Sequence, residues 1–276
     1  MIRETLALTR RELLRLARNP QAIATSLLLP ILYLLLFGQA LNFGRLFGSD
    51  SAAFIPYVNG APTYFSYFAA GMAGFVAVTA TLFIGANVIF DRLFGVLKRI
   101  ASTPASAVSI FGSRLLAGLV QPVGLAFLVL GLAVALGHLG LSGLVVTAGF
   151  GVVAGAEVVL AIVILSVMFA SLFLAIGFSV EQPQTYFAVV NAINLPVLLT
   201  SAALYPWGIL PGWMQAIASY NPITLAVTVL RLDLFAGAAA YYPYPAWVYL
   251  LGLLGWAAAM ILLATALARR ALAPRQ

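Results

Sequence analysis

The stretch that decides the fold is residues 64–106. It reads YFSYFAAGMAGFVAVTATLFIGANVIF at 64–90 and DRLFGVLKRIASTPAS at 91–106. The first part has no charged residue and is long enough to cross a bilayer as a helix, which takes about 20 mostly apolar residues. The second part carries an acid–base pair, a basic pair and a Thr-Pro, and residues 115–156 are again uncharged. This pattern predicts two spanning helices joined by a charged segment at one membrane surface.

The composition points to the same environment. Hydrophobic residues make up 63% of the 276-residue chain, charged residues only 8%, and the mean hydropathy is +1.08. A soluble domain is about 45–50% apolar and about 25% charged, so this chain lacks the polar residues to cover a water-exposed surface. Long uncharged runs favour helices over the alternating segments of a membrane barrel. The chain has no cysteine, which excludes disulfides and thiolate chemistry. We therefore predict an all-α membrane protein.

Six transmembrane helices are predicted. Their approximate ranges are 22–42, 64–90, 106–137, 142–178, 184–205 and 246–268. The fourth is longer than one crossing requires, and we interpret it as one tilted or kinked helix loosened by Gly149, Gly151 and Gly155. Six crossings place both termini on the same side of the membrane.

The basic residues are distributed unevenly over the two sides that six spans create. Residues 1–20 hold five arginines, the 91–114 segment holds four basic residues and the tail after 268 holds three, whereas the other side has only Arg45 and Arg231. Cytoplasmic loops carry an excess of Lys and Arg. The asymmetry predicts a cell-membrane protein with both termini in the cytoplasm. The N-terminal basic segment and the apolar run after it are too long for a cleaved signal peptide.

Two further segments are predicted to lie at the membrane surfaces. In residues 1–20, apolar residues recur at helical spacing opposite five arginines, which is typical of an amphipathic helix in the cytoplasmic interface. Simple orientation of the first span by positive charge is the alternative. Residues 206–235 are too rich in Pro for a plain crossing and too apolar for a free loop. They predict a pair of short re-entrant or interfacial helices on the outer side.

The 91–104 segment has the features of a short docking helix. We expect Asp91 to cap its first turn, Leu93 and Leu97 to share an apolar face, and Thr103 with Pro104 to start the next helix. A solvated basic loop is the alternative. Such a loop would need neither an apolar stripe nor caps.

The chain offers little catalytic chemistry. It has one histidine, and no paired carboxylates or GxSxG motif lie within the predicted spans, which argues against a membrane enzyme. No GxxxxGK[ST] motif is present, so any ATPase that drives transport must be a separate polypeptide. A secondary transporter or channel without an ATPase partner stays open as the alternative, because Glu157 lies within a predicted span.

The order of these motifs resembles the membrane subunits of type-2 ABC (ATP-binding cassette) exporters, most closely the drug-resistance and nodulation-factor export branch. The resemblance covers essentially the whole chain. It rests on Arg18-Asn19-Pro20, DRLFGVLKRIASTP at 91–104, S-x-x-x-x-R-L-L from Ser109, N-x-x-x-L-P at 191–196, YP at 205–206, LPGWM at 210–214, NP at 221–222 and Arg231. The sequence departs from the family at Leu93, where the family often has Glu.

The resemblance implies a permease that moves a hydrophobic or amphipathic substrate, drug-like or lipid-like, by alternating access. Residues 1–276 would be one transmembrane domain that pairs with a second copy or a sister permease, and with two ABC ATPase subunits that bind the ATP and Mg²⁺. No cofactor, metal or nucleic acid is expected on this chain. The implied interface helix contains Arg10, Arg11, Arg15 and Arg18. The implied ATPase-coupling residues are Asp91, Arg92, Gly95, Leu97, Lys98, Arg99, Thr103 and Pro104.

A substrate pathway is predicted around the second and fifth spans. Phe187, Asn191 and Asn194 share one helical face, and amides in a span are costly toward lipid. That face is expected to line the pathway or to form hydrogen bonds at a dimer seam, and both alternatives stay open. Phe75 and Phe83 of the second span suit an apolar substrate or lipid equally. Glu157 is assigned either to a polar pathway or to structural hydrogen bonding.

Overall fold

The computed structural model describes residues 28, 30–36, 55–96, 99, 107–139, 141–146 and 150–271. Within this described part the regular structure is helical, as predicted, with eight α-helices and three short 3-10 helices. The α-helices are α4 (Tyr64–Leu93), α6 (Ala107–Gly118), α7 (Val120–His138), α8 (Val152–Ser179), α9 (Pro183–Leu199), α10 (Gly212–Tyr220), α11 (Pro222–Leu234) and α12 (Ala246–Ala271). The 3-10 helices are η2 (Ile55–Val58), η3 (Trp207–Ile209) and η4 (Ala238–Ala240).

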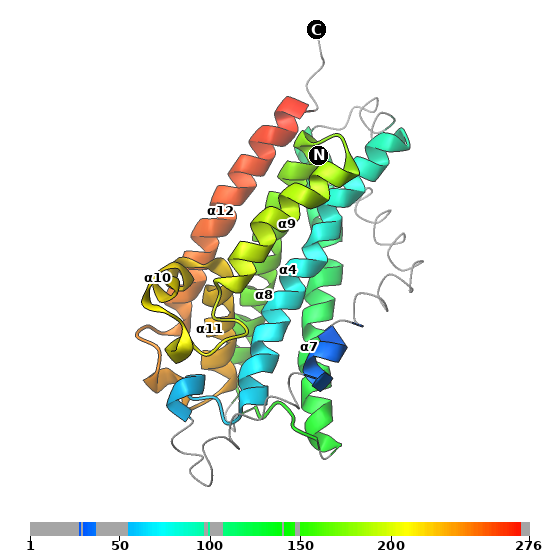
Figure 1. Ribbon diagram of the computed structural model, residues 1–276. Helices are drawn as coiled ribbons and strands as arrows, with labels where there is room; N and C mark the ends of the chain where they lie inside the picture. The colour runs from blue at the N-terminus through cyan, green and yellow to red at the C-terminus, as the bar shows by residue number, and fades with distance from the viewer. Residues whose placement is uncertain are drawn as a thin grey trace.

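The long helices form an elongated bundle in which α8 is central (Figure 1). α8 packs against α12 on one side and against α4 on the other, and α7 lies on the far side of α4. The short helix α11 fits between α4, α8 and α12 at one end of the bundle. α9 has few neighbours and lies over α4 and α8. One side of α4 is therefore free to form a cavity with α9.

Glycines allow the central helices to approach closely. A Cβ atom on Gly85 of α4 would collide with the Phe173 carbonyl of α8, and one on Gly177 of α8 would collide with the Gly85 carbonyl. Small residues at such crossings let helix backbones meet in a membrane, where hydrophobic attraction between helices is weak. The backbones of α4 and α8 are consequently in close contact at this crossing.

In the part of the chain that the structure describes, four helices are long and apolar enough to cross a membrane, so the chain is a multi-pass membrane protein. They are Tyr64–Leu93, Ile110–His138, Val152–Ser179 and Ala246–Arg270. They agree with the predicted second, third, fourth and last spans. The first predicted span falls largely outside the described residues, although residues 30–36 are helical. The fifth corresponds to α9, whose 17 residues extend about 26 Å at 1.5 Å per residue.

The prediction of one helix over 142–178 is wrong, because the helix begins only at Val152. Residues 141–146 instead run back along the end of α7 in an irregular conformation. The Leu144 amide donates to the Ala133 carbonyl at 2.8 Å, and the Val145 amide donates to the Ser66 hydroxyl at 3.2 Å. Apolar composition alone cannot distinguish such a segment from helix, since these backbone groups find partners on neighbouring helices.

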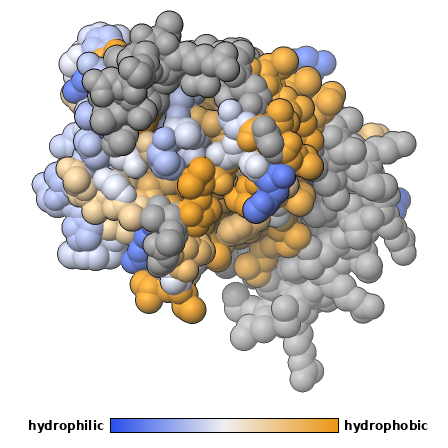
Figure 2. Space-filling view, turned by 90° about the horizontal axis from the view of Figure 1, so that it is seen from below, coloured by the Kyte–Doolittle hydropathy of each residue, from blue (hydrophilic) through white to orange (hydrophobic). Residues whose placement is uncertain are grey.

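The two ends of the bundle differ in character. The C-terminal ends of α4 and α12 and the α8–α9 turn lie at one end (Figure 1), which we call the basic end because Arg92, Arg114, Arg269 and Arg270 occur there. The opposite end carries α10 and α11, the predicted helix pair. Seen from that end, the described surface is mostly orange or pale, with only small strongly hydrophilic patches (Figure 2). This composition suits a membrane interface.

Candidate functional site

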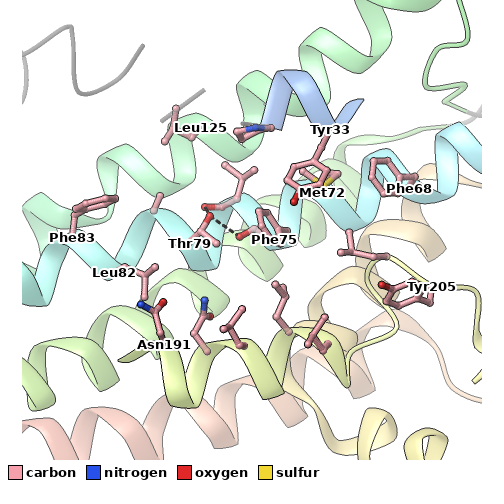
Figure 3. A pocket seen from close by; sticks show the side chains of 18 of the residues that line it. Tyr33, Phe68, Met72, Phe75, Thr79, Leu82, Phe83, Leu125, Asn191 and Tyr205 are labelled. Atoms are coloured by element: carbon pink, nitrogen blue, oxygen red, sulfur yellow. Dashed lines mark hydrogen bonds between the residues drawn. The ribbon is translucent and has the colours of Figure 1, made fainter. Parts of the chain in front are cut away.

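A cavity of about 770 Å³ separates α4 from α9. Side chains of the two helices face each other across it, and Tyr33 of the 30–36 helical segment lies at its rim (Figure 3). The lining residues are Pro30, Tyr33, Tyr64, Phe68, Met72, Phe75, Val76, Thr79, Ala80, Leu82, Phe83, Leu125, Asn191, Asn194, Leu195, Leu198, Leu199, Leu204 and Tyr205. Small-molecule sites typically enclose about 300–1,000 Å³, so the cavity has room for a molecule of several fused rings.

The α4 wall of the cavity is aromatic. Phe68, Phe75 and Phe83 are spaced along this wall (Figure 3). Tyr33 packs edge-on against Phe75 with ring centroids 6.0 Å apart. The predicted pathway residues Phe75 and Phe83 therefore do line a cavity, although Phe83 remains 52% exposed. Offset and edge-on contacts with such rings favour flat apolar or aromatic ligands.

The α9 wall supplies the polar groups. Asn191 and Asn194 both line the cavity, as their shared helical face predicts. Asn194 is only 4% exposed, and its Oδ1 atom has no hydrogen-bond partner among the described residues. The Thr79 hydroxyl opposite already donates to the Phe75 carbonyl at 3.0 Å. A buried amide without a partner is costly, so Asn194 is available to hydrogen-bond a ligand. Among the described residues, the lining includes no charged side chain.

Two predicted pathway residues lie elsewhere. Phe187 packs edge-on against Tyr186 at 5.3 Å and is outside the cavity lining. Glu157 of α8 lies beside Asp233, near the end of the short helix α11. Burial, the charge of Glu157 and a hydrogen bond with it raise the pKa of Asp233 to about 7. The sequence analysis did not single out Asp233, because a partner on a distant helix leaves no local pattern.

A buried arginine that the sequence analysis included only as part of the family resemblance holds the turn after α9, next to the cavity. Arg231 of α11 is 1% exposed and donates to the carbonyls of Ala202, Ala203 and Tyr67 at 2.8, 2.8 and 3.2 Å. Its guanidinium carbon stands 3.4 Å from the centroid of the Tyr67 ring. The Tyr67 hydroxyl donates to the carbonyls of Ala202 and Tyr205 at 3.0 and 2.8 Å. The turn that carries the lining residues Leu204 and Tyr205 is thus held by α4 and α11.

Asn221 adds a second link to the same region. Its Oδ1 atom accepts the Ile223 amide at 2.9 Å and caps α11, and Pro222 follows at the favoured first helical position. Its Nδ2 group donates to the Val197 carbonyl at 2.6 Å, near the end of α9. The Asn-Pro motif therefore joins the start of α11 to the end of the cavity wall.

The predicted docking segment begins differently from the expectation. Asp91 is not an N-cap, because α4 continues through Leu93 and Phe94 is its C-cap. Asp91 is buried and forms an ion pair with Arg114 at 2.8 Å. Gly95 has a φ of +71°, which ends the helix in the left-handed conformation that Gly tolerates best. Helical backbone resumes at Val96, and the Arg99 amide donates to the Gly95 carbonyl at 3.3 Å.

The outward side chains of this turn are apolar. Leu93 and Phe94 are 59% and 75% exposed at the basic end of the bundle. Several predicted residues lie outside the described residues and stay predictions. These are Leu97, Lys98, Thr103 and Pro104 of the coupling segment, and Arg10, Arg11, Arg15 and Arg18 of the N-terminal helix.

Comparison with known families decides what kind of protein carries this cavity. Residues 3–235 match the family described as ABC-2 type transporter. The chain belongs to that family. It is 27% identical over 235 residues, 84% of this chain and 74% of the relative, to the "Putative transport permease ycf38" of Porphyra purpurea. It is 26% identical over 230 residues (83% and 76%) to the "Probable doxorubicin resistance ABC transporter permease protein DrrC" of Mycobacterium tuberculosis.

A third relative is the "Daunorubicin resistance ABC transporter permease protein DrrB1" of Streptomyces coeruleorubidus, 26% identical over 223 residues, 81% of this chain and 71% of the relative. The chain is accordingly an ABC-2 permease, the membrane subunit and not the ATPase. Permeases of this family work with nucleotide-binding subunits. The predicted family and function are thereby confirmed, and the secondary transporter or channel is no longer needed as an alternative.

Proposed function

We propose that this permease exports a bulky hydrophobic or amphipathic molecule, and that the molecule binds in the cavity between α4 and α9. The cavity itself is the observation that carries the proposal. It combines an aromatic wall with amides on the facing helix, and none of its described lining residues is charged. The names of two relatives refer to resistance against doxorubicin and daunorubicin. Aromatic polycyclic molecules of that kind match the size and polarity of this cavity.

The proposed topology has six spans, with α9 as the fifth and the region around residues 22–42 as the first. The basic end would then face the cytoplasm, since Lys and Arg are enriched there. α10 and α11 would lie at the outer interface, where the exposed Trp213 and Tyr220 suit contact with headgroups.

Coupling would involve the segment after α4. Its exposed Leu93 and Phe94 and the following helical turn would rest on an ABC ATPase subunit, which binds ATP and Mg²⁺. Residues 1–20 would form the interface helix in contact with lipid. A second copy or a sister permease would complete the transporter, and the exposed side of α9 that does not line the cavity, with Val189, Ala192 and Pro196, is available for that contact. ATP binding would alternate the access of the cavity by favouring one state over the other.

The test uses inside-out membrane vesicles that contain the permease and its ATPase, with doxorubicin as the fluorescent probe. We expect ATP-dependent doxorubicin accumulation that falls about tenfold in Asn194→Leu, because one good hydrogen bond in a buried site contributes about 1–1.5 kcal/mol. Asn191→Leu should have a smaller effect, since Asn191 is exposed and more readily hydrated.

The matched control is Gln215→Leu, which removes an amide from α10, away from the cavity lining. It should leave accumulation unchanged once the amounts of folded protein are equalised. Normal transport in both cavity variants would remove the cavity from the substrate route. Absence of ATP-dependent accumulation for a panel of aromatic amphiphiles would refute the proposed substrate class.

A further inference from the structure

Hydrogen bonds of Arg92 join the last turn of α4 to the end of α8, just before the turn that leads into α9. Arg92 donates through Nη1 to the Val180 carbonyl at 2.7 Å and through Nη2 to the Phe178 carbonyl at 2.8 Å. These carbonyls belong to the C-terminal end of α8, where the last C=O groups lack helical donors and the helix dipole is negative. A guanidinium satisfies two of them at once because its donors are held in a rigid fork.

A further bond joins the two cavity walls directly. The Tyr186 hydroxyl of α9 donates to the Leu82 carbonyl of α4 at 2.6 Å. Leu82 itself lines the cavity, and the neighbouring Gly85 leaves the space into which the Tyr186 hydroxyl fits. Tyr186 is completely buried. The bond therefore lies where the cavity ends toward the basic end.

The position of Arg92 is itself fixed. Its neighbour Asp91 pairs with Arg114 of α6 at 2.8 Å, and both side chains are nearly inaccessible, at 5% and 6% exposed. Buried ion pairs of this kind add more to geometric specificity than to stability. Immediately after Arg92, the backbone turns outward to Leu93 and Phe94. The last turn of α4 thus carries both Arg92, which bonds to the end of α8, and the exposed apolar side chains of Leu93 and Phe94.

We propose that Arg92 and Tyr186 form a gate that closes the cavity toward the basic end: Tyr186 holds the α9 wall against the α4 wall, and Arg92 holds α4 to the end of α8 from which α9 departs. Opening separates the Arg92 guanidinium from the Phe178 and Val180 carbonyls and the Tyr186 hydroxyl from the Leu82 carbonyl. Arg92 is then a positioning residue that transmits movement of the 93–99 segment to the start of α9. That the gate faces the cytoplasm rests on the topology under Proposed function.

The experiment measures water access to the cavity and does not depend on transport. The chain has no cysteine, so Thr79→Cys places a single thiol in the cavity lining. The complete permease–ATPase complex is reconstituted in vesicles and labelled with a membrane-impermeant maleimide from the side of the basic end. A single thiol introduced by Arg270→Cys, at an exposed position of that end, reports which vesicles present this side.

In the nucleotide-free complex the Thr79→Cys thiol should react slowly. Adding Arg92→Gln together with Tyr186→Phe should speed its labelling from the basic end about tenfold or more, as the loss of three hydrogen bonds requires. Tyr186→Phe alone removes one oxygen atom and should give a smaller increase. This single variant keeps the test valid if the double variant folds poorly. Arg92→Lys should be intermediate, since a single ammonium lacks the two-pronged geometry.

The matched control is Arg269→Gln, which removes the same charge from an exposed position at the same end and should not change the labelling rate. Equal labelling rates with and without the Arg92 and Tyr186 substitutions would overturn the gate. Labelling of the Arg270→Cys thiol from the extracytoplasmic side would overturn the proposed topology and leave the gate itself standing. Failure of doxorubicin accumulation would likewise count against the substrate and not against the gate.

Discussion

Replacing Arg231 by Met is the sharpest test of how the turn after α9, which carries the cavity-lining residues Leu204 and Tyr205, is held in place. Met keeps an apolar, unbranched stem but removes all three hydrogen bonds to the carbonyls of Ala202, Ala203 and Tyr67. The Ala202 carbonyl keeps the Tyr67 hydroxyl as a donor. The Ala203 carbonyl is left without another donor among the described residues, because Arg231 supplies the one bond it receives there.

The expected loss follows from these contacts. Hydrogen bonds to a charged group contribute about 1.5–3 kcal/mol each, and an orphaned buried acceptor costs about 1–3 kcal/mol. Removing the buried cation recovers part of its desolvation cost, so the three bonds do not add up in full. We expect a net destabilisation of about 3 kcal/mol, equivalent to a fall of roughly 6–12 °C in the unfolding midpoint. The measurement is thermal unfolding of the purified permease in one detergent, followed by intrinsic tryptophan fluorescence.

Tyr67→Phe provides the second half of a double-mutant cycle. It removes the hydroxyl that donates to the Ala202 and Tyr205 carbonyls and leaves the ring under the Arg231 guanidinium. Because both residues hold the same turn, the double variant should lose less stability than the sum of the two single variants, with a coupling of about 0.5–3 kcal/mol. If the stability losses of the two single variants were strictly additive, or if Arg231→Met changed the unfolding midpoint by less than about 2 °C, Arg231 would not be the residue that holds the turn.

Two further predictions concern charged pairs. The pKa of Asp233 is about 7 in the folded protein against 3.8 when unperturbed, so between these values the folded state binds more protons than the unfolded state and stability falls as pH rises. The unfolding temperature should therefore be lower at pH 8 than at pH 5, and Asp233→Asn should reduce this difference. The same pH profile in the variant would contradict the prediction. For the Asp91–Arg114 pair, each single charge reversal, Asp91→Arg or Arg114→Asp, should lower the free energy of unfolding by about 3–5 kcal/mol. Size-exclusion profiles of detergent extracts should show that the double reversal restores much of the folded protein. Without such a rescue, the two residues would not act as a pair.

The parts of the structure that were predictable from the sequence are those in which one segment determines its own environment. An uncharged run such as 64–90 must be helical to satisfy its backbone in a membrane, and α4 indeed covers it. The spacing of Asn191 and Asn194 places both on one face of α9, and both line the cavity. Their shared face could be predicted because helical periodicity is local.

The misassigned features depend on contacts between distant segments. Asp91 has the composition of an N-cap, but Arg114 of α6 draws it into the interior and α4 continues past it. Residues 141–146 are apolar enough for a helix, but α7 and Ser66 satisfy their backbone in another conformation. Glu157 was assigned from its depth in a span, whereas its partner Asp233 decides its environment. No local pattern encodes such pairings.

The segments on both sides of α9 are held by hydrogen bonds from an arginine to backbone carbonyls, and this affects how access to the cavity can alternate. At one end Arg231 binds carbonyls of the turn after α9, and at the other Arg92 binds carbonyls of the turn before it. Phe178 and Val180 lie at the end of α8, and Ala202 and Ala203 lie in a turn, so breaking either set of bonds exposes both a cation and carbonyls that need new partners. Water provides such partners at the membrane surfaces but not at the apolar centre of the cavity.

Each end can therefore open by hydration at its own surface, while opening both ends at once would double the free-energy cost and fill the apolar cavity with water. An arginine from another helix therefore holds the segment on each side of α9, so a small displacement of α9 would strain one set of bonds and leave the other in place.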